Sequence, residues 1–193
     1  MPITLGLLKN LLIKPHETLP KIKESSDTTV AQMVLNWILV GIGIGIVSEQ
    51  IVYSLAAIVG GIVAQTIFTL FLKAALMIAG GKGQYRDVLS STTYPFFGLS
   101  LIIPIISLIG KTNPLAGIGA ATILVTLYSV VALVGFLTML RNSFKLDLIT
   151  LWVILSLVIM AMTIAAYVSI GLFSIIPGLK YLTISDFINY FSF

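Results

Sequence analysis

The sequence predicts an all-α fold: an integral membrane helical bundle of five transmembrane helices, with an amphipathic helix at each end of the chain. The first observation behind this prediction is composition, because 58% of the 193 residues are apolar and only 9% are charged. A soluble domain is typically about one-quarter charged. A chain this poor in charge suits lipid as its solvent. The lengths of the apolar stretches and the placement of the basic residues indicate the same class.

Five apolar stretches are candidates to cross a hydrocarbon core, which takes about 20 residues of helix. They cover residues 30–47, 51–72, 94–109, 115–140 and 148–176. The third is short, and a continuation of the second to residue 79 is left open. Only Ser48, Glu49 and Gln50 separate the first two, so we expect these two helices to form an antiparallel hairpin.

The basic residues divide unequally between the two sides of the predicted bundle. Four precede the first span, three lie between the second and third, and two between the fourth and fifth, so nine of the eleven share one side. Lys111 and Lys180 fall on the other side. Cytoplasmic loops carry an excess of Lys and Arg. The sequence therefore predicts a multi-pass cell-membrane protein with its N-terminus in the cytoplasm and its C-terminus outside.

Small residues four apart mark the helix faces that we expect to pack. In lipid, helices associate where small side chains allow close approach, and residues four apart share a face. Gly and Ala are also common in membrane spans for other reasons. The expected packing residues are Gly41 and Gly45 in the first span, Ala56, Gly60 and Ala64 in the second, and Ala161 and Ala165 in the fifth.

Three other residues within the spans carry structural predictions. Asn36 and Gln65 are the deepest polar residues, and each is expected to form hydrogen bonds across helices. Pro104 lies inside the third span, where it removes a backbone hydrogen bond and is expected to kink the helix.

The two ends of the chain have helical apolar spacing outside the bundle of residues 30–176. Residues 1–29 are expected to be a cytoplasmic amphipathic segment, either lying on the leaflet or docked on the bundle. Residues 177–193 are expected to be an interfacial tail that lies on the outer leaflet or against a partner. The apolar face of the tail consists of Ile184, Phe187, Ile188 and Phe191.

Residues that could carry chemistry are scarce. The chain has no Cys and one histidine, His16, so we expect no thiolate chemistry and no metal site. The acidic residues are scattered, and the Gly-rich loop at 80–87 lacks the spacing of a phosphate-binding loop. A net charge of +4 is explained by membrane-flanking Lys and Arg, not by a nucleic-acid partner. The sequence therefore predicts no catalytic residues, no cofactor and no enzyme activity.

Several short motifs run along most of the chain. They are LLIKPHETLPKI at 11–22, Gly81 and Gly83 in the second loop, Tyr94 and Pro95 at the third span, and FKL at 144–146. Together they resemble the prokaryotic Yip-type domain proteins, relatives of the Ypt-interacting proteins of eukaryotic secretory membranes. The resemblance implies five spans, a cytoplasmic N-terminus and a non-enzymatic role in membrane organisation or trafficking.

The expected partners are the lipid bilayer and either other membrane proteins or a second copy of this chain. Two alternatives stay open: an accessory subunit of a larger membrane complex, and a small transporter or channel. No Asp, Glu, Lys or Arg lies at the centre of a span, whereas ion and proton carriers usually place ionisable residues there.

Overall fold

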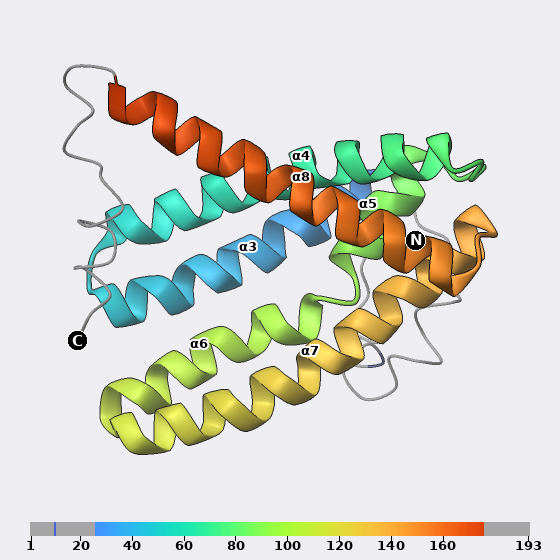
Figure 1. The fold of residues 1–193 in the computed structure, drawn as a ribbon. Coiled ribbons are helices and arrows are strands. Elements are labelled where there is room, and N and C mark those ends of the chain that lie inside the picture. Colours follow the sequence, from blue (N-terminus) through green and yellow to red (C-terminus); the bar gives the residue numbers. More distant parts are fainter. Residues whose placement is uncertain (1–9, 11–25, 176–193) are drawn as a thin grey trace. The chain divides into compact units, whose positions relative to one another are not determined.

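The computed structural model describes residue 10 and residues 26–175, with side chains for 28–168 within the helices. Every regular element in the described part is a helix (Figure 1). The helices are α3 (Ser26–Ser48), α4 (Ile51–Ile78), α5 (Tyr85–Thr93), α6 (Phe97–Thr112), α7 (Pro114–Phe144) and α8 (Leu148–Ile175). The chain forms two compact units, residues 1–154 and 155–193, so α8 starts in the first unit and continues in the second.

Five helical segments are long and apolar enough to cross a membrane, which confirms the predicted fold class. They are Thr28–Ser48, Ile51–Ile78, Tyr85–Thr112, Pro114–Phe144 and Leu148–Val168. The first helix begins four residues earlier than predicted and the fourth ends four residues later. The predicted amphipathic segments at 1–29 and 177–193 lie outside the described residues, except for residue 10 and the start of α3.

The predicted hairpin between the first two spans is present as α3 and α4. Its turn is tight because Glu49 adopts the left-handed conformation, with φ of 57°, and its N–H bonds to the Gly45 carbonyl at 3.0 Å. A second hairpin joins α6 and α7 through Asn113, whose side chain accepts a hydrogen bond from the Ala116 N–H at 3.1 Å. This is ordinary N-capping, with Pro114 at the first helical position.

The third span differs from its prediction. It begins at Tyr85 instead of residue 94 and is broken into α5 and α6 at residues 94–96. A capping box starts α5, since the Gln84 N–H donates to Asp87 Oδ2 at 2.7 Å. The expected kink at Pro104 is not where the span is interrupted, because α6 continues through that residue and the break lies at Pro95.

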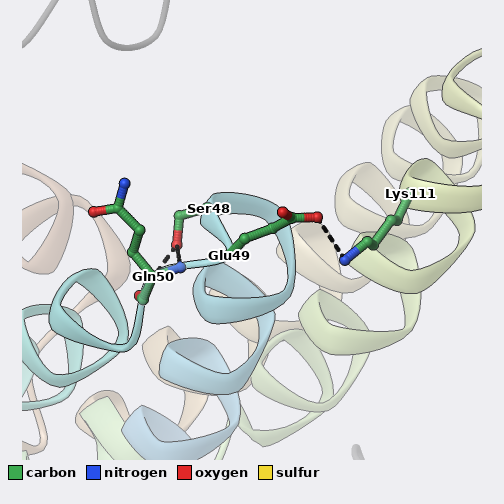
Figure 2. Close-up of polar contacts among 4 residues, drawn as sticks. All are labelled: Ser48, Glu49, Gln50 and Lys111. Carbon is green, nitrogen blue, oxygen red and sulfur yellow. Dashed lines mark hydrogen bonds and ion pairs between the residues drawn. The ribbon is translucent and has the colours of Figure 1, made fainter.

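Two pairs of turns meet at opposite ends of the first unit. At the Glu49 end, Glu49 of the α3–α4 turn forms an ion pair with Lys111 of α6 at 2.8 Å (Figure 2). At the Phe144 end, the Phe144 ring lies against Gly81 and Gly83 of the α4–α5 loop. Alternate turns therefore lie at the same end of the first unit.

The core of the first unit lies toward the Phe144 end. Fully buried side chains there come from α4, α5, α7 and the start of α8, among them Leu72, Leu76, Val88, Leu140, Phe144 and Leu151. Near the Glu49 end, by contrast, Val47, Ile51, Leu108 and Leu115 are exposed. Exposed apolar side chains on a membrane-spanning helix are the surface that lipid covers.

Candidate functional site

Polar side chains gather around the point where α5 ends and α6 begins. In hydrocarbon, an unsatisfied polar group costs several kcal/mol, so groups at this depth need partners within the protein. The members, buried or half-buried, are Thr29, Gln32 and Asn36 of α3, Gln65 and Thr69 of α4, Ser90, Thr92 and Thr93 of α5, and Ser100 of α6. We call this set the polar cluster.

The break in the third span leaves carbonyl groups at the end of α5 without their usual helical donors. Pro95 has no N–H, so it cannot continue the hydrogen-bond ladder. The Phe97 N–H donates to the Tyr94 carbonyl at 3.2 Å, in a tighter turn than an α-helix makes. The carbonyls of Thr92 and Thr93 therefore point out of the helix end and need donors from elsewhere.

Asn36 and Gln65 supply those donors. Asn36 Nδ2 donates to the Thr93 carbonyl at 2.9 Å, and Gln65 Nε2 donates to the Thr92 carbonyl at 2.9 Å. The prediction that these two residues form hydrogen bonds across helices is confirmed. Two amide side chains from α3 and α4 thus replace the backbone N–H groups that an unbroken helix would provide.

Further hydrogen bonds fix the Gln65 amide. Its oxygen accepts from the Trp37 ring nitrogen at 2.7 Å, and its nitrogen also donates to the Thr93 hydroxyl at 3.1 Å. The Thr69 and Thr92 hydroxyls lie 3.3 Å apart. Each polar atom of the Gln65 side chain is therefore engaged, and the indole of Trp37 is oriented by it.

The Asn36 amide is held in the same way, whereas its neighbour Gln32 has one amide atom without a partner among the described residues. Asn36 Oδ1 accepts from Gln32 Nε2 at 2.9 Å and from the Ser100 hydroxyl at 3.3 Å. The Thr29 and Ser90 hydroxyls lie 3.2 Å apart. Gln32 Oε1 is buried and accepts no hydrogen bond from any described residue.

The cluster consists of amides and hydroxyls only. These groups can hold a backbone in place or bind a small polar molecule, but none of them titrates near neutral pH. Across the described residues, no three Asp, Glu, His or Cys side chains come together in a way that could hold a metal ion.

The glycines predicted to pack in the first span do face α4. An added Cβ at Gly41 would meet the Ile58 side chain and would lie 2.9 Å from the Ser54 carbonyl oxygen. An added Cβ at Gly45 would lie 3.3 Å from the Ser54 Cβ. The Ser54 hydroxyl donates to the Gly41 carbonyl at 2.7 Å, a bond that only close approach of the two helices permits.

The predicted packing face of the second span does not contact the other described helices of this chain. An added Cβ at Gly60 would meet nothing within 4 Å, and Ala56 and Ala64 are exposed on the same face. The packed residue is the neighbouring Gly61, where a Cβ would run into the Trp37 ring. One residue along a helix is a rotation of about 100°, so the adjacent glycines point to different sides.

Gly43 is a packing residue that the four-residue spacing missed. An added Cβ there would lie 2.5 Å from Ile103 Cγ2 and 3.1 Å from the Pro104 nitrogen. It lies two residues from Gly41 and so faces a different neighbour, α6.

In the second unit, Ala161 and Ala165 lie on α8, and their packing role stays a prediction. Ile184, Phe187, Ile188 and Phe191 lie outside the described residues.

The loop residues that carried the family resemblance lie at the two ends of α5. An added Cβ would lie 2.7 Å from the Phe144 ring at Gly81 and 2.5 Å from it at Gly83, so a side chain at either position would force the ring to shift. Tyr94 and Pro95 are buried at the break where α5 ends. Phe144, at the end of α7, therefore seats the loop that leads into the broken span.

Two carboxylates outside the spans have shifted pKa values. A hydrogen bond and the positive charge of Lys111 lower the pKa of Glu49 below its ordinary 4.5 (Figure 2). Hydrogen bonds from the side chain and backbone of Thr150 lower the pKa of Asp147 below 3.8. Both carboxylates are therefore charged at neutral pH, one in an ion pair and one capping the start of α8.

Comparisons of the chain with protein-family models, with curated proteins and with solved structures find no match.

Proposed function

We propose that this chain is a Yip-type integral membrane protein with a non-enzymatic role in membrane organisation or trafficking, acting through helix–helix contacts with other membrane proteins or with a second copy of itself. The observation that carries the proposal is where the resemblance residues lie. Gly81 and Gly83 precede α5 and pack on Phe144, and Tyr94 and Pro95 end it. The loop at 81–83 and the FKL motif at 144–146 are far apart in the sequence but in contact around α5. This contact supports treating the motifs as one family signature.

The composition of the polar cluster also supports a non-enzymatic role. Its two central amides bind backbone carbonyls of the broken span, so their donors are already in use. The cluster stabilises an unusual backbone instead of presenting free reactive groups. A protein built in this way acts through its shape and surfaces.

One exposed surface on α4 suits a helical partner. Ala56, Gly60 and Ala64 face away from the neighbouring helices, and small residues four apart are what close helix–helix approach in lipid uses. The absence of Cys from the sequence makes the test direct. Single cysteines at these positions should cross-link to a partner or a second copy in native membranes, whereas cysteine at Leu55, which is also exposed, should not. Equal cross-linking at all four positions would argue against a specific face.

The orientation is part of the same proposal. Lys82, Arg86, Arg141 and Lys145 lie on segments at the Phe144 end, whereas the Glu49 end has Lys111 in an ion pair. The excess of basic residues supports a cytoplasmic Phe144 end. Single cysteines at positions 82 and 145 should react with a membrane-impermeant reagent only from the cytoplasmic side, and one at 111 only from outside. The opposite labelling would reverse the orientation.

A small transporter remains the second candidate because the third span is broken. Transporters often bind substrates where a discontinuous helix exposes backbone and polar groups near the middle of the membrane. The buried Gln32 Oε1 accepts no hydrogen bond from a described residue, so it is the cluster atom through which a polar solute would bind. Uptake of small polar solutes into proteoliposomes, abolished by Gln32→Leu but not by Thr66→Val, would favour this function over the first.

A further inference from the structure

We propose that the turn between α7 and α8 binds the headgroup of an anionic phospholipid, with Arg141 and Lys145 as its cationic groups. This site goes beyond the proposed function and does not depend on it. It requires only that α7 and α8 span the bilayer, so that their connecting turn lies at the level of the headgroups.

The turn forms a polar recess. Its lining consists of Arg141, Asn142, Lys145, Leu146 and Asp147, all within the first unit. Arg141 lies in the last turn of α7, and its carbonyl accepts the Lys145 N–H at 2.9 Å. Lys145 has φ of 55°, the left-handed conformation in which a helix commonly ends. This reversal places both basic residues on the wall of one recess.

Neither positive charge of the recess is held in an ion pair within the described part of the chain. Arg141 and Lys145 are exposed, and neither forms an ion pair with another described residue. The only acidic group in the lining, Asp147, is committed to the start of α8, where its Oδ2 accepts the Thr150 N–H at 3.1 Å. With the Asp147 carboxylate included, the lining keeps a net positive charge, and its basic side chains have no acidic partner among the described residues.

A lipid phosphate is the anion that this position favours. Guanidinium and ammonium groups bind phosphate oxygens through charge-assisted hydrogen bonds, and the Asn142 amide can add a neutral donor. Basic pockets at the ends of membrane spans bind anionic headgroups, whereas a soluble anion would gain nothing from the neighbouring bilayer. Leu146, half-buried beside the charges, offers an apolar contact for the start of an acyl chain.

Native mass spectrometry of the purified protein, given equimolar phosphatidylglycerol and phosphatidylcholine in micelles, tests the proposal. The wild-type protein should retain phosphatidylglycerol preferentially. Arg141→Gln and Lys145→Gln should each weaken that retention about fivefold, and the double variant more than tenfold. Lys82→Gln, which removes a charge at the same end but outside the recess, is the matched control and should bind as the wild type does.

Four outcomes would overturn the site. They are equal retention of the two lipids by the wild type, retention by the double variant, an equal loss in Lys82→Gln, and displacement of the lipid by an equal concentration of inorganic phosphate. The exchange of the two basic types, Arg141→Lys with Lys145→Arg, keeps the charge and should keep at least part of the preference. If the double glutamine variant does not fold, the wild-type lipid preference and this exchange variant still decide the question.

Discussion

Replacing Gln65 with Leu tests whether the polar cluster stabilises the broken third span. Leu has a similar volume but no polar atoms, so the change removes hydrogen bonds without opening a large cavity. Two groups lose a partner: the Trp37 ring N–H, bonded at 2.7 Å, and the Thr92 carbonyl, bonded at 2.9 Å. The Thr93 hydroxyl also loses a bond, but a threonine hydroxyl can turn back to a carbonyl of its own helix.

The size of the effect follows from these two groups. Hydrogen bonds between membrane helices contribute on average about 0.6 kcal/mol and at most about 1.7 kcal/mol. A buried group left without any partner costs about 1–3 kcal/mol. Because the chain leaves the helix at residues 94–96, the Thr92 carbonyl has no helical N–H donor and cannot recover its bond locally. We expect Gln65→Leu to lower the free energy of unfolding by about 2–4 kcal/mol.

The measurement is unfolding in mixed micelles with increasing dodecyl sulfate, followed by circular dichroism. Thr66→Val is the matched control, because the Thr66 hydroxyl donates to the Ile62 carbonyl of its own helix at 2.8 Å. It should change the free energy of unfolding by less than about 0.5 kcal/mol. If Gln65→Leu is equally mild, or if both variants lose the same amount, the cluster does not hold the break.

Three further predictions rest on single positions. Gly41→Ala should destabilise the α3–α4 hairpin by about 1–3 kcal/mol, because its Cβ would meet Ile58. Gly60→Ala should be neutral or mildly stabilising in the same dodecyl sulfate titration. The reverse order of stabilities would contradict the assigned faces. Gly81→Ala should lower the free energy of unfolding by a similar amount, because its Cβ would clash with the Phe144 ring. Gly119→Ala is the control, since a Cβ there would meet nothing. Equal stability of the two variants would show that the loop does not pack on Phe144. The lowered pKa of Glu49 means that its ion pair contributes stability above pH 4.5, which is lost as the pH falls through the folded-state pKa. Thermal unfolding midpoints measured across this range should depend less on pH in Glu49→Gln, and an unchanged acid profile would be evidence against the pair.

The five spans could be predicted from the sequence because length and apolarity alone determine them. A helix that crosses lipid must bond its own backbone and cover it with apolar side chains, whatever its neighbours are. The roles of Asn36 and Gln65 were predictable for the same reason. A polar side chain isolated in an apolar helix can satisfy its hydrogen bonds only on another segment of the protein.

The short helix α5 could not be predicted by that reasoning. Residues 90–93 read Ser-Ser-Thr-Thr, which is typical of a loop by composition, yet all four are buried. They are tolerated because Ser91 and Thr92 bond to carbonyls of their own helix. The other two side chains find partners on α3 and α4, since the Ser90 hydroxyl lies 3.2 Å from that of Thr29 and the Thr93 hydroxyl accepts from the Gln65 amide. Such partners come from residues more than 20 positions away, so local composition carries no signal for them.

The side of α4 that packs on α3 could not be predicted from the sequence for a different reason. Adjacent glycines point about 100° apart around a helix, and the sequence does not say which of the two faces the neighbour. Gly60 and Gly61 are equivalent as small residues, and the regular spacing of Ala56 and Ala64 favours Gly60. The deciding residue is Trp37 on the opposite helix, whose ring needs the space that only a missing Cβ leaves, and whose N–H must reach Gln65. Gln65 is four residues from Gly61, so both lie on one face. The polar partner and the small residue thus select the same face together. The deepest polar residue of a span is therefore a better guide to its packed side than the longest run of small residues.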